Sequence, residues 1–309
     1  MKNFAYAALA LTGASAFGAP AIVGFDLGRG GAFSISQGGA LTTLRGVILG
    51  AYPSATIGGV SALSPSGLAG ADVVFLASTT AGTSAIAPLS ASEQTALYDF
   101  VLAGGGAVIF SDNDSFAGGA SQPANHSLLA PFGLTCAGTG LPWQRTATVL
   151  DPHSSPVTDG PFGLSQTFSI GWPGWFNGLG GATSLATLND NGQSALALIP
   201  RGAIGPGSGG VVLFSDCTMI GDGYFPAANQ TLVLNAIAFA VDRGCAGDLN
   251  SDGLVDDADF SLFVVAYNLL DCADGAMPAG CPADFNRDGF VDDADFSIFV
   301  VAYNELICP

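Results

Sequence analysis

Short apolar runs alternate with helical patterns through most of the chain. Four runs, each bounded by Gly or Asp, predict buried strands over residues 21–25, 72–76, 107–110 and 211–214. Ser92-Glu93-Gln94 predicts the start of a helix that ends near Ala103, and a second helix is predicted over residues 229–241. Strands that alternate with helices predict a mostly parallel sheet covered on both faces, the three-layer, flavodoxin-like α/β class.

The last part of the chain has a different pattern, an internal repeat. Residues 245–272 align without gaps on residues 281–308, and 20 of the 28 aligned positions are identical. Each copy has a polar loop followed by apolar residues at helical spacing. These residues are Phe260, Phe263, Val264 and Tyr267 in the first copy and Phe296, Phe299, Val300 and Tyr303 in the second. We expect the copies to pack about a pseudo-two-fold axis, in a small all-α domain over 245–309 that follows an α/β domain over 22–242.

Each loop carries the pattern D-x-N-x-D-G-x-x-D-x-x-D, which is typical of a 12-residue, EF-hand-like calcium loop. Such loops supply oxygen ligands from positions 1, 3, 5, 7, 9 and 12, with glycine at position 6 for the sharp turn. The predicted ligands are Asp248, Asn250, Asp252, Leu254 (carbonyl), Asp256 and Asp259, and then Asp284, Asn286, Asp288, Phe290 (carbonyl), Asp292 and Asp295. We therefore predict two Ca²⁺ ions. Position 12 is Asp instead of Glu, and its shorter reach would weaken bidentate binding.

Because a helix follows each loop and none precedes it, residues 245–308 resemble the dockerin family. Dockerins attach secreted proteins to cohesin domains, so the resemblance implies calcium-dependent folding and a cohesin-type partner. It places partner contacts at Asp257, Ala258, Val264 and Val265, mirrored by Asp293, Ala294, Val300 and Val301. Val264 and Val300 also fall on the apolar stripe, so a core position is the alternative for them. The Ser-Thr pair of well-known dockerins is absent at positions 10 and 11, which implies a different partner specificity. Since the copies are nearly identical, either could present the binding face.

The N-terminus predicts an export signal over residues 1–21. Lys2 precedes an apolar stretch over residues 4–17, and small residues allow cleavage after Ala16 or Ala21. A buried first helix is the alternative. The stretch is too short to span a membrane, so no membrane insertion is expected. We expect a secreted protein, extracellular or at the cell surface.

The even number of cysteines, 6, agrees with an oxidising compartment and predicts disulfides. Two arrangements respect the repeat: Cys245–Cys308 with Cys272–Cys281, or Cys245–Cys272 with Cys281–Cys308. The first is favoured, because a helix of about 12 residues carries its far end about 18 Å from its own loop. Cys136 and Cys217 are left to pair with each other.

Charge narrows the classes of partner. The chain has 25 Asp and Glu against 7 Lys and Arg, a net charge of −18, and this acidity disfavours nucleic acid and anionic membranes. With 49% apolar and 10% charged residues, the composition excludes a disordered protein. Residues 245–309 hold 13 acidic residues and one Arg, a net of −12, so most of the acidity falls where calcium is predicted.

Residues 22–242 resemble the class I glutamine amidotransferase-like fold, close to the ThuA-like (trehalose-utilisation) group. The resemblance lies in GADVVFLAS, LSASEQTALYDFVLAGGGAVIFSD, DPHSSPVTDGPFG and GGVVLFSDCTMIGDGYFPAANQTLVLNAIAFAV. The family's nucleophilic cysteine would follow residues 107–110, where this chain has Ser111-Asp112-Asn113-Asp114. Glutaminase chemistry is therefore not expected, and the sequence also lacks the G-x-S-x-G motif of serine hydrolases.

Asp26, Asp112 and Asp216 each follow a predicted strand, and ligands bind at the carboxyl ends of parallel strands. With His153 they are the candidate catalytic residues. They could hold a metal or sugar hydroxyls, or act as the acid and base of a glycosidase; the alternative is that they cap helices or turns. Trp143, Trp172 and Trp175 with Phe176 could stack on a glycan, or anchor loops.

Three functions remain open. The sequence favours a docking tail that displays a non-catalytic α/β binding domain, because a nucleophile elbow is missing and Glu is scarce. The second is a dockerin-borne hydrolase of polysaccharide breakdown. In the third, the tail is only a cap stabilised by calcium and disulfides.

Overall fold

The computed structural model describes residues 20–79, 84–138, 143–205, 207–242, 247–250, 254–278, 281–286 and 288–305. Nearly all of the predicted export signal lies outside these residues, as do Cys245, Cys308 and the predicted ligand Asp252. Within the described part of the chain, no helix has the length and apolar character needed to cross a membrane.

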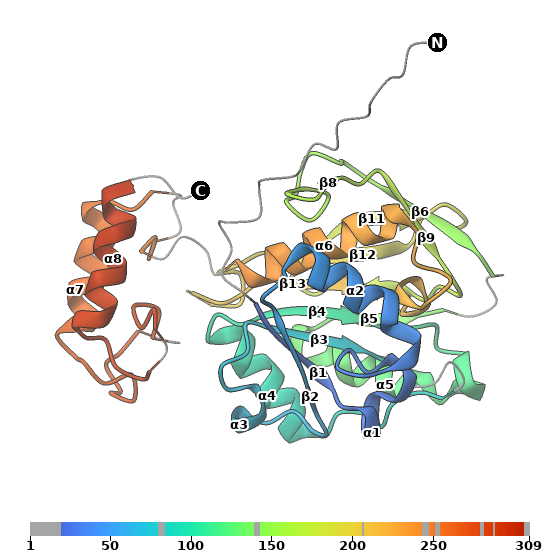
Figure 1. The fold of residues 1–309 in the computed structure, drawn as a ribbon, viewed down its shortest axis with the longest axis horizontal. Helices are drawn as coiled ribbons and strands as arrows, with labels where there is room; N and C mark the ends of the chain where they lie inside the picture. Colours follow the sequence, from blue (N-terminus) through green and yellow to red (C-terminus); the bar gives the residue numbers. More distant parts are fainter. Residues whose placement is uncertain are drawn as a thin grey trace, which may run out of the picture.

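A mixed sheet forms the centre of the α/β region, residues 20–242 (Figure 1). Its strand order is β2-β1-β3-β4-β13-β12-β11-β6-β9, and β10 and β5 extend it beside β12. The first five strands of this order are parallel. They are β1 (Ala21–Phe25), β2 (Thr56–Val60), β3 (Val73–Ala77), β4 (Gly106–Phe110) and β13 (Val211–Phe214). The four strands predicted from apolar runs are therefore confirmed, and all of them belong to this parallel half.

The other half of the sheet is antiparallel, which the sequence patterns did not predict. It comprises β5 (Thr135–Ala137), β6 (Arg145–Val149), β9 (Thr167–Ile170), β10 (Trp175–Gly178), β11 (Thr183–Leu188) and β12 (Ser194–Ile199). A separate two-stranded ribbon joins β7 (Asp159–Gly160) and β8 (Gly163–Leu164). In β6 and β9, buried and exposed positions alternate over four or five residues rich in Thr and Ser. Such short alternation is a weaker signal than a continuous apolar run.

Helices cover both faces of the sheet, as the three-layer prediction requires. Buried residues of α2 (Thr42–Ala51) and α6 (Ala227–Val241) pack with one face. Those of α3 (Pro65–Leu68), α4 (Ala91–Leu102) and α5 (Ser121–Leu129) pack with the other, and α1 (Leu27–Gly30) follows β1. The predicted helices correspond to α4 and α6. The side chain of Ser90 accepts a hydrogen bond from the Glu93 backbone N–H in a capping box that fixes the start of α4.

The C-terminal region, residues 247–305, contains α7 (Asp257–Tyr267) and α8 (Asp293–Glu305), which lie side by side in Figure 1. Phe263 and Phe299 are buried and stack at 5.0 Å between ring centroids. The outer contacts come in mirrored pairs: the Tyr267 hydroxyl donates to Asp293, and the Tyr303 hydroxyl donates to Asp257, each at 2.5 Å. These matched contacts give the two copies the pseudo-two-fold arrangement expected of the repeat.

The buried face of α7 differs from the apolar stripe predicted for it, which was Phe260, Phe263, Val264 and Tyr267. Ala266 is buried beside Phe263, whereas Phe260 is 41% exposed and Val264 is also exposed. The buried face is therefore rotated toward Asp259, Phe263 and Ala266. Asp259 lies on this face because its carboxylate accepts backbone N–H groups of the preceding loop.

The disulfide predictions have different outcomes. Cys272 and Cys281 form a disulfide, as the favoured arrangement predicts, and the arrangement that pairs Cys245 with Cys272 is excluded. The predicted Cys136–Cys217 bond is wrong, since both thiols are free and buried. Cys136 belongs to the hydrophobic cluster on one face of the sheet and Cys217 to the cluster on the other. The sheet itself separates them.

Candidate functional site

Two of the four candidate catalytic residues meet at the carboxyl end of the parallel strands. Asp112 follows β4 and Asp216 follows β13, and these neighbouring strands pair with Phe110 opposite Phe214. One oxygen from each carboxylate and the Sγ of Cys217 lie within 4.8 Å of one another. All three side chains are buried. Asp112 and Asp216 therefore lie together at the ends of two neighbouring strands.

Asp26 and His153 do not join this pair. Asp26 is the N-cap of α1, and its Oδ1 accepts a hydrogen bond from the Arg29 backbone N–H at 2.9 Å. His153 is exposed, with its Nδ1 2.7 Å from Oδ2 of Asp159. The capping alternative therefore holds for Asp26, and the four candidates do not form one site.

The hydrogen bonds of the pair restrict its chemistry. Both oxygens of Asp216 accept backbone N–H groups, from Gly171 at 2.5 Å and Thr218 at 2.9 Å. Asp112 accepts the backbone N–H of Asn113 at 2.7 Å and the thiol of Cys217 at 3.2 Å. Burial, and then the nearby charge of Asp216, raises the pKa of Asp112 well above its usual value. Burial also raises the pKa of Asp216. The two raised pKa values have the same sense: charging both carboxyls in this buried setting is costly, so the protonated forms are favoured.

Asp216 does not suit the acid or the base of a glycosidase, because such a carboxyl must exchange a proton with, or attack, the sugar or a water. Here both oxygens of Asp216 are bonded to backbone N–H groups and the side chain is fully buried. The geometry favours a structural role for Asp216.

A cavity of about 510 Å³ opens beside Asp112. Aromatic rings supply much of its wall: Trp143 lies 4.3 Å from Trp172 and 4.5 Å from Tyr224 between ring centroids. Phe176 is buried, and Trp175 packs against the core. Of the predicted aromatic group, only the first two tryptophans line this cavity, which has the size and apolar character of a small-molecule site.

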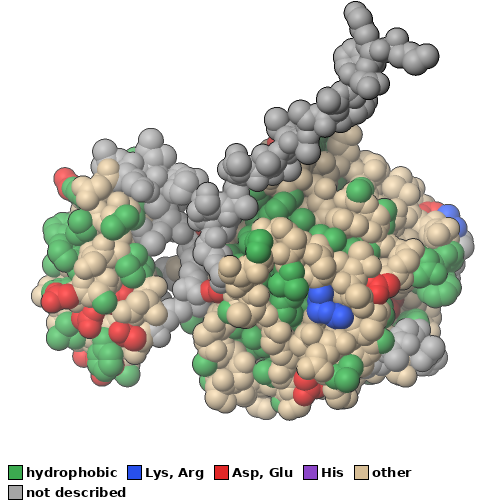
Figure 2. Space-filling model, in the orientation of Figure 1, with side chains coloured by type: hydrophobic (Ala, Val, Ile, Leu, Met, Phe, Trp, Pro, Cys, Tyr) green, Lys and Arg blue, Asp and Glu red, His purple; other side chains and the backbone are tan. Residues whose placement is uncertain are grey.

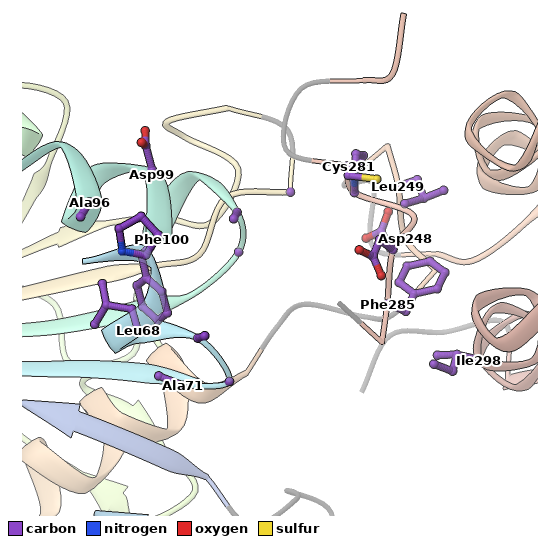
Figure 3. A pocket seen from close by; sticks show the side chains of 18 residues that line it. Leu68, Ala71, Ala96, Asp99, Phe100, Asp248, Leu249, Cys281, Phe285 and Ile298 are labelled. Carbon is purple, nitrogen blue, oxygen red and sulfur yellow. The ribbon is translucent and has the colours of Figure 1, made fainter. Parts of the chain in front are cut away.

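A second hollow, of about 500 Å³, lies between the α/β region and the C-terminal region. Figure 3 shows Leu68 and Phe100 on one side and Asp248, Phe285 and Ile298 on the other, with open space between them. The side chains drawn do not converge on a common point. We interpret this hollow as a gap between two separately packed regions.

The calcium loops predicted from sequence are best described in the second copy. Gly289 at position 6 has a φ of 91°, which glycine adopts without strain, and its N–H donates to Oδ2 of Asp284 at position 1. The N–H of Asp288 donates to Oδ1 of Asn286, and the N–H of Phe290 donates to Oδ1 of Asp288. The loop thus winds around the side-chain oxygens at positions 1, 3 and 5.

The aspartates at position 12 close both loops. Asp295 Oδ1 accepts the N–H groups of Phe285 and Asn286, and its Oδ2 accepts that of Asp292. Asp259 repeats this pattern in the first loop, and both residues are fully buried. A carboxylate has about four lone-pair sites. Three of them accept backbone N–H groups in each of these aspartates, so one site is left for a cation. The all-oxygen donor set of the loops fits Ca²⁺.

The predicted partner-binding residues lie on the surface. Val265 is 54% exposed and Val301 is 62% exposed, and Val264 and Val300 are exposed as well. Ala258 and Ala294 are also exposed, whereas Asp257 and Asp293 accept the tyrosine hydroxyls described above. The core alternative for Val264 and Val300 is wrong. Figure 2 shows acidic and hydrophobic side chains together on the C-terminal region.

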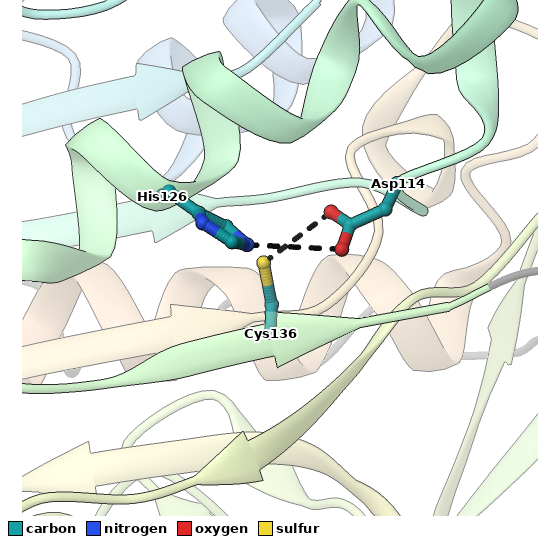
Figure 4. A group of neighbouring side chains, drawn as sticks. All are labelled: Asp114, His126 and Cys136. Atoms are coloured by element: carbon teal, nitrogen blue, oxygen red, sulfur yellow. Dashed lines mark hydrogen bonds and ion pairs between the residues drawn. The ribbon is translucent and has the colours of Figure 1, made fainter.

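Sequence reasoning missed one cluster, formed by Asp114, His126 and Cys136 (Figure 4). The three residues come from a loop, a helix and a strand, so no local motif connects them. Only the contact that the fold creates between these elements identifies the group.

No protein-family model matches the chain, and no curated protein matches it. Among solved structures, the chain is similar to the N-terminal domain of mmIFT52, with a TM-score of 0.51 and 12% identity over 71% of this chain and 96% of that one. It is also similar to a ThuA-like protein from Bacteroides uniformis, with a TM-score of 0.47 and 15% identity over 72% of this chain and 92% of that one. A ThuA-like protein from Parabacteroides merdae is similar with a TM-score of 0.43 and 12% identity over 72% of this chain and 90% of that one. ThuA-like proteins are thus among the structures that the α/β region resembles, and these likenesses concern the fold alone.

Proposed function

We propose that the C-terminal region is a calcium-stabilised docking module of a secreted protein, and that it binds a cohesin-type partner while displaying the α/β region as a binding domain. The observation that carries the proposal is the mirrored architecture: two loop-then-helix units with matched contacts and a matched pair of exposed valines. Val264 and Val265 on α7 and Val300 and Val301 on α8 are exposed at matching positions, and neighbouring exposed apolar side chains support an interaction surface.

The residues that would hold calcium are the loop oxygens at positions 1, 3, 5, 7, 9 and 12 of each copy. Bound calcium would neutralise carboxylates that otherwise repel one another, which supports folding of a region with a net charge of −12. Within each loop, the backbone N–H groups that donate to Asp259 and Asp295 hold the two ends together.

The partner surface would lie on α7 or α8, around Val264 and Val265 or Val300 and Val301. The two sites are related by the pseudo-two-fold axis, so either copy could present the same apolar face. A change in one copy should therefore leave binding through the other.

Pull-down of the full chain on a panel of cohesin domains tests this proposal. We expect capture in calcium that is lost with a chelator, near-normal capture for Val265→Asp or Val301→Asp alone, and loss for the double variant. The matched control is Leu150→Asp, an exposed apolar residue of the α/β region. Capture that is unchanged both by the chelator and by the double substitution would contradict the docking role. Correct calcium-dependent folding with no capture by any cohesin would favour the cap alternative.

The cavity beside Asp112 supports a second candidate function, binding of a glycan by the α/β region, with polysaccharide hydrolysis as its catalytic form. Its tryptophans could stack on a sugar ring, and Asp112 could accept a sugar hydroxyl. A glycan-binding and hydrolysis screen with Trp172→Ala and Asp112→Asn tests this. Binding without turnover supports a display domain, whereas turnover abolished by Asp112→Asn supports the hydrolase.

A further inference from the structure

Three potential metal ligands converge away from the Asp112–Asp216 pair (Figure 4). Asp114 lies in the loop after β4, His126 on α5 and Cys136 on β5. The Sγ of Cys136 is 3.6 Å from Oδ1 of Asp114, and Nε2 of His126 is 3.7 Å from Oδ2 of the same carboxylate. One ligand atom from each of the three residues lies within 4.8 Å of the others.

The two distances from Asp114, 3.6 Å to Sγ of Cys136 and 3.7 Å to Nε2 of His126, match those around one zinc ion, although they start from different oxygens of the carboxylate. With Zn–N and Zn–O bonds of about 2.0–2.2 Å and a Zn–S bond of about 2.3 Å, ligand atoms of a tetrahedral site lie roughly 3.3–3.7 Å apart. Because single ligand atoms of the three residues lie within 4.8 Å of one another, the side chains would have to close slightly around the ion. A thiolate, an imidazole and a carboxylate form a donor set that suits zinc, whereas calcium and magnesium prefer oxygen alone. We propose that Asp114, His126 and Cys136 form a zinc-binding site with three protein ligands.

The surroundings of the cluster hold the carboxylate in place. Asn125, which is buried, donates from Nδ2 to Oδ1 of Asp114 at 3.1 Å and to the backbone carbonyl of Asp112 at 2.7 Å. Its Oδ1 accepts the backbone N–H of Asp112 at 2.9 Å. Asn125 is fixed by its two hydrogen bonds to the Asp112 backbone, and its third hydrogen bond orients the carboxylate of Asp114. Residues that hydrogen-bond metal ligands in this way hold them in position for the metal.

The cluster is buried at Cys136 and reaches solvent at His126. Cys136 is buried, whereas the side chain of His126 is 46% exposed. This exposure leaves room for a water as the fourth ligand, the arrangement of zinc sites that keep an open position. On binding, the zinc–sulfur bond replaces the thiol S–H bond, and the proton that Cys136 donates to Asp114 leaves to solvent.

The chain offers matched controls for this site. Cys217 also contacts an aspartate, Asp112, but its cluster contains no histidine. His153 also contacts an aspartate, Asp159, but within the described part of the chain it belongs to no group of three potential metal ligands. Each control therefore combines an aspartate with only one of the other two ligand types, a cysteine or a histidine.

Cobalt(II) titration of the full chain without reductant, so that the Cys272–Cys281 disulfide stays closed, and with calcium present to fill the tail loops, tests the proposal. Cobalt bound to a thiolate gives a charge-transfer absorption that oxygen ligands do not give. We expect one such cobalt per chain, displaced by zinc. Cys136→Ser should abolish the band and His126→Gln should weaken binding by at least about tenfold, while Cys217→Ser and His153→Gln behave as wild type.

Absence of the band in the wild-type protein would overturn the proposal, and so would a band that survives Cys136→Ser or disappears in Cys217→Ser. If Cys136→Ser fails to fold, His126→Gln decides the outcome, because its half-exposed side chain can change without disturbing the core. Wild-type cobalt affinity in that folded variant would contradict the site.

Discussion

The α/β region buries continuous apolar clusters on both faces of a large sheet, whereas the described part of the C-terminal region has a single small cluster around Phe263 and Phe299. Residues 1–244 carry a net charge of −6, whereas the 65 residues from 245 to 309 carry a net charge of −12. A domain of that size has too little core to offset chain entropy and charge repulsion together. We therefore expect the second region to depend on its loops, its disulfide and bound cations for its stability.

The largest expected effect comes from the closing aspartates of the loops. Asp259→Ala with Asp295→Ala removes two buried acceptors that together bind six backbone N–H groups. Each buried donor left without a partner costs about 1–3 kcal/mol, so the C-terminal region should not fold even with calcium. Loss of helical circular dichroism with unchanged tryptophan fluorescence would agree, because all three tryptophans lie in the α/β region. An intact helical signal would show that these residues are dispensable.

The next effect concerns the Cys272–Cys281 disulfide, which has a sequence separation of 9. Closing so short a loop contributes about 2–3 kcal/mol to folding. The double variant Cys272→Ser with Cys281→Ser should therefore unfold in its C-terminal region at lower urea concentration, at the same calcium level. The urea midpoint reported by tryptophan fluorescence should not move. A shift in that midpoint would mean that the two regions unfold together.

A pH effect is expected in the α/β region, from Asp112. Burial and the charge of Asp216 raise the pKa of Asp112 in the folded protein above the unfolded value of 3.8. The folded state then binds the proton more tightly, so stability falls as the pH rises from 3.8 through the raised pKa. Asp112→Asn should reduce this loss, and thermal melting followed by tryptophan fluorescence from pH 4 to 8 measures it. If Asp112→Asn shows the same dependence of melting temperature on pH as the wild type, the dependence comes from Asp216 or another group.

The smallest effect on stability is expected on the exposed helix face. Val265→Asp or Val301→Asp should change the unfolding free energy by less than about 0.5 kcal/mol, because these side chains are in solvent. Urea unfolding in calcium checks this. A larger loss would mean that these valines pack against another part of the molecule and cannot serve as a free docking surface.

The features that sequence could predict are those encoded locally. Continuous apolar runs predicted β1, β3, β4 and β13, and the calcium pattern defined loops that Asp295 closes in the structure. In the antiparallel half, β6 and β9 were not predicted because only alternate positions are buried, whereas β12 is buried at all six positions and its apolar run was overlooked. The Cys136–Cys217 prediction failed because the count of cysteines does not reveal that the sheet lies between them. Asp114, His126 and Cys136 form a group only after a loop, a helix and a strand have packed together.

Hydrogen exchange of the full chain, followed by mass spectrometry with calcium and then with a chelator, tests the central claim most directly. We predict that α7 and α8 are protected in calcium and exchange freely after chelation, while β4 and β13 stay protected in both conditions. Equal protection of α7 and α8 with and without calcium would contradict the account, because the C-terminal region would then fold without its predicted metal.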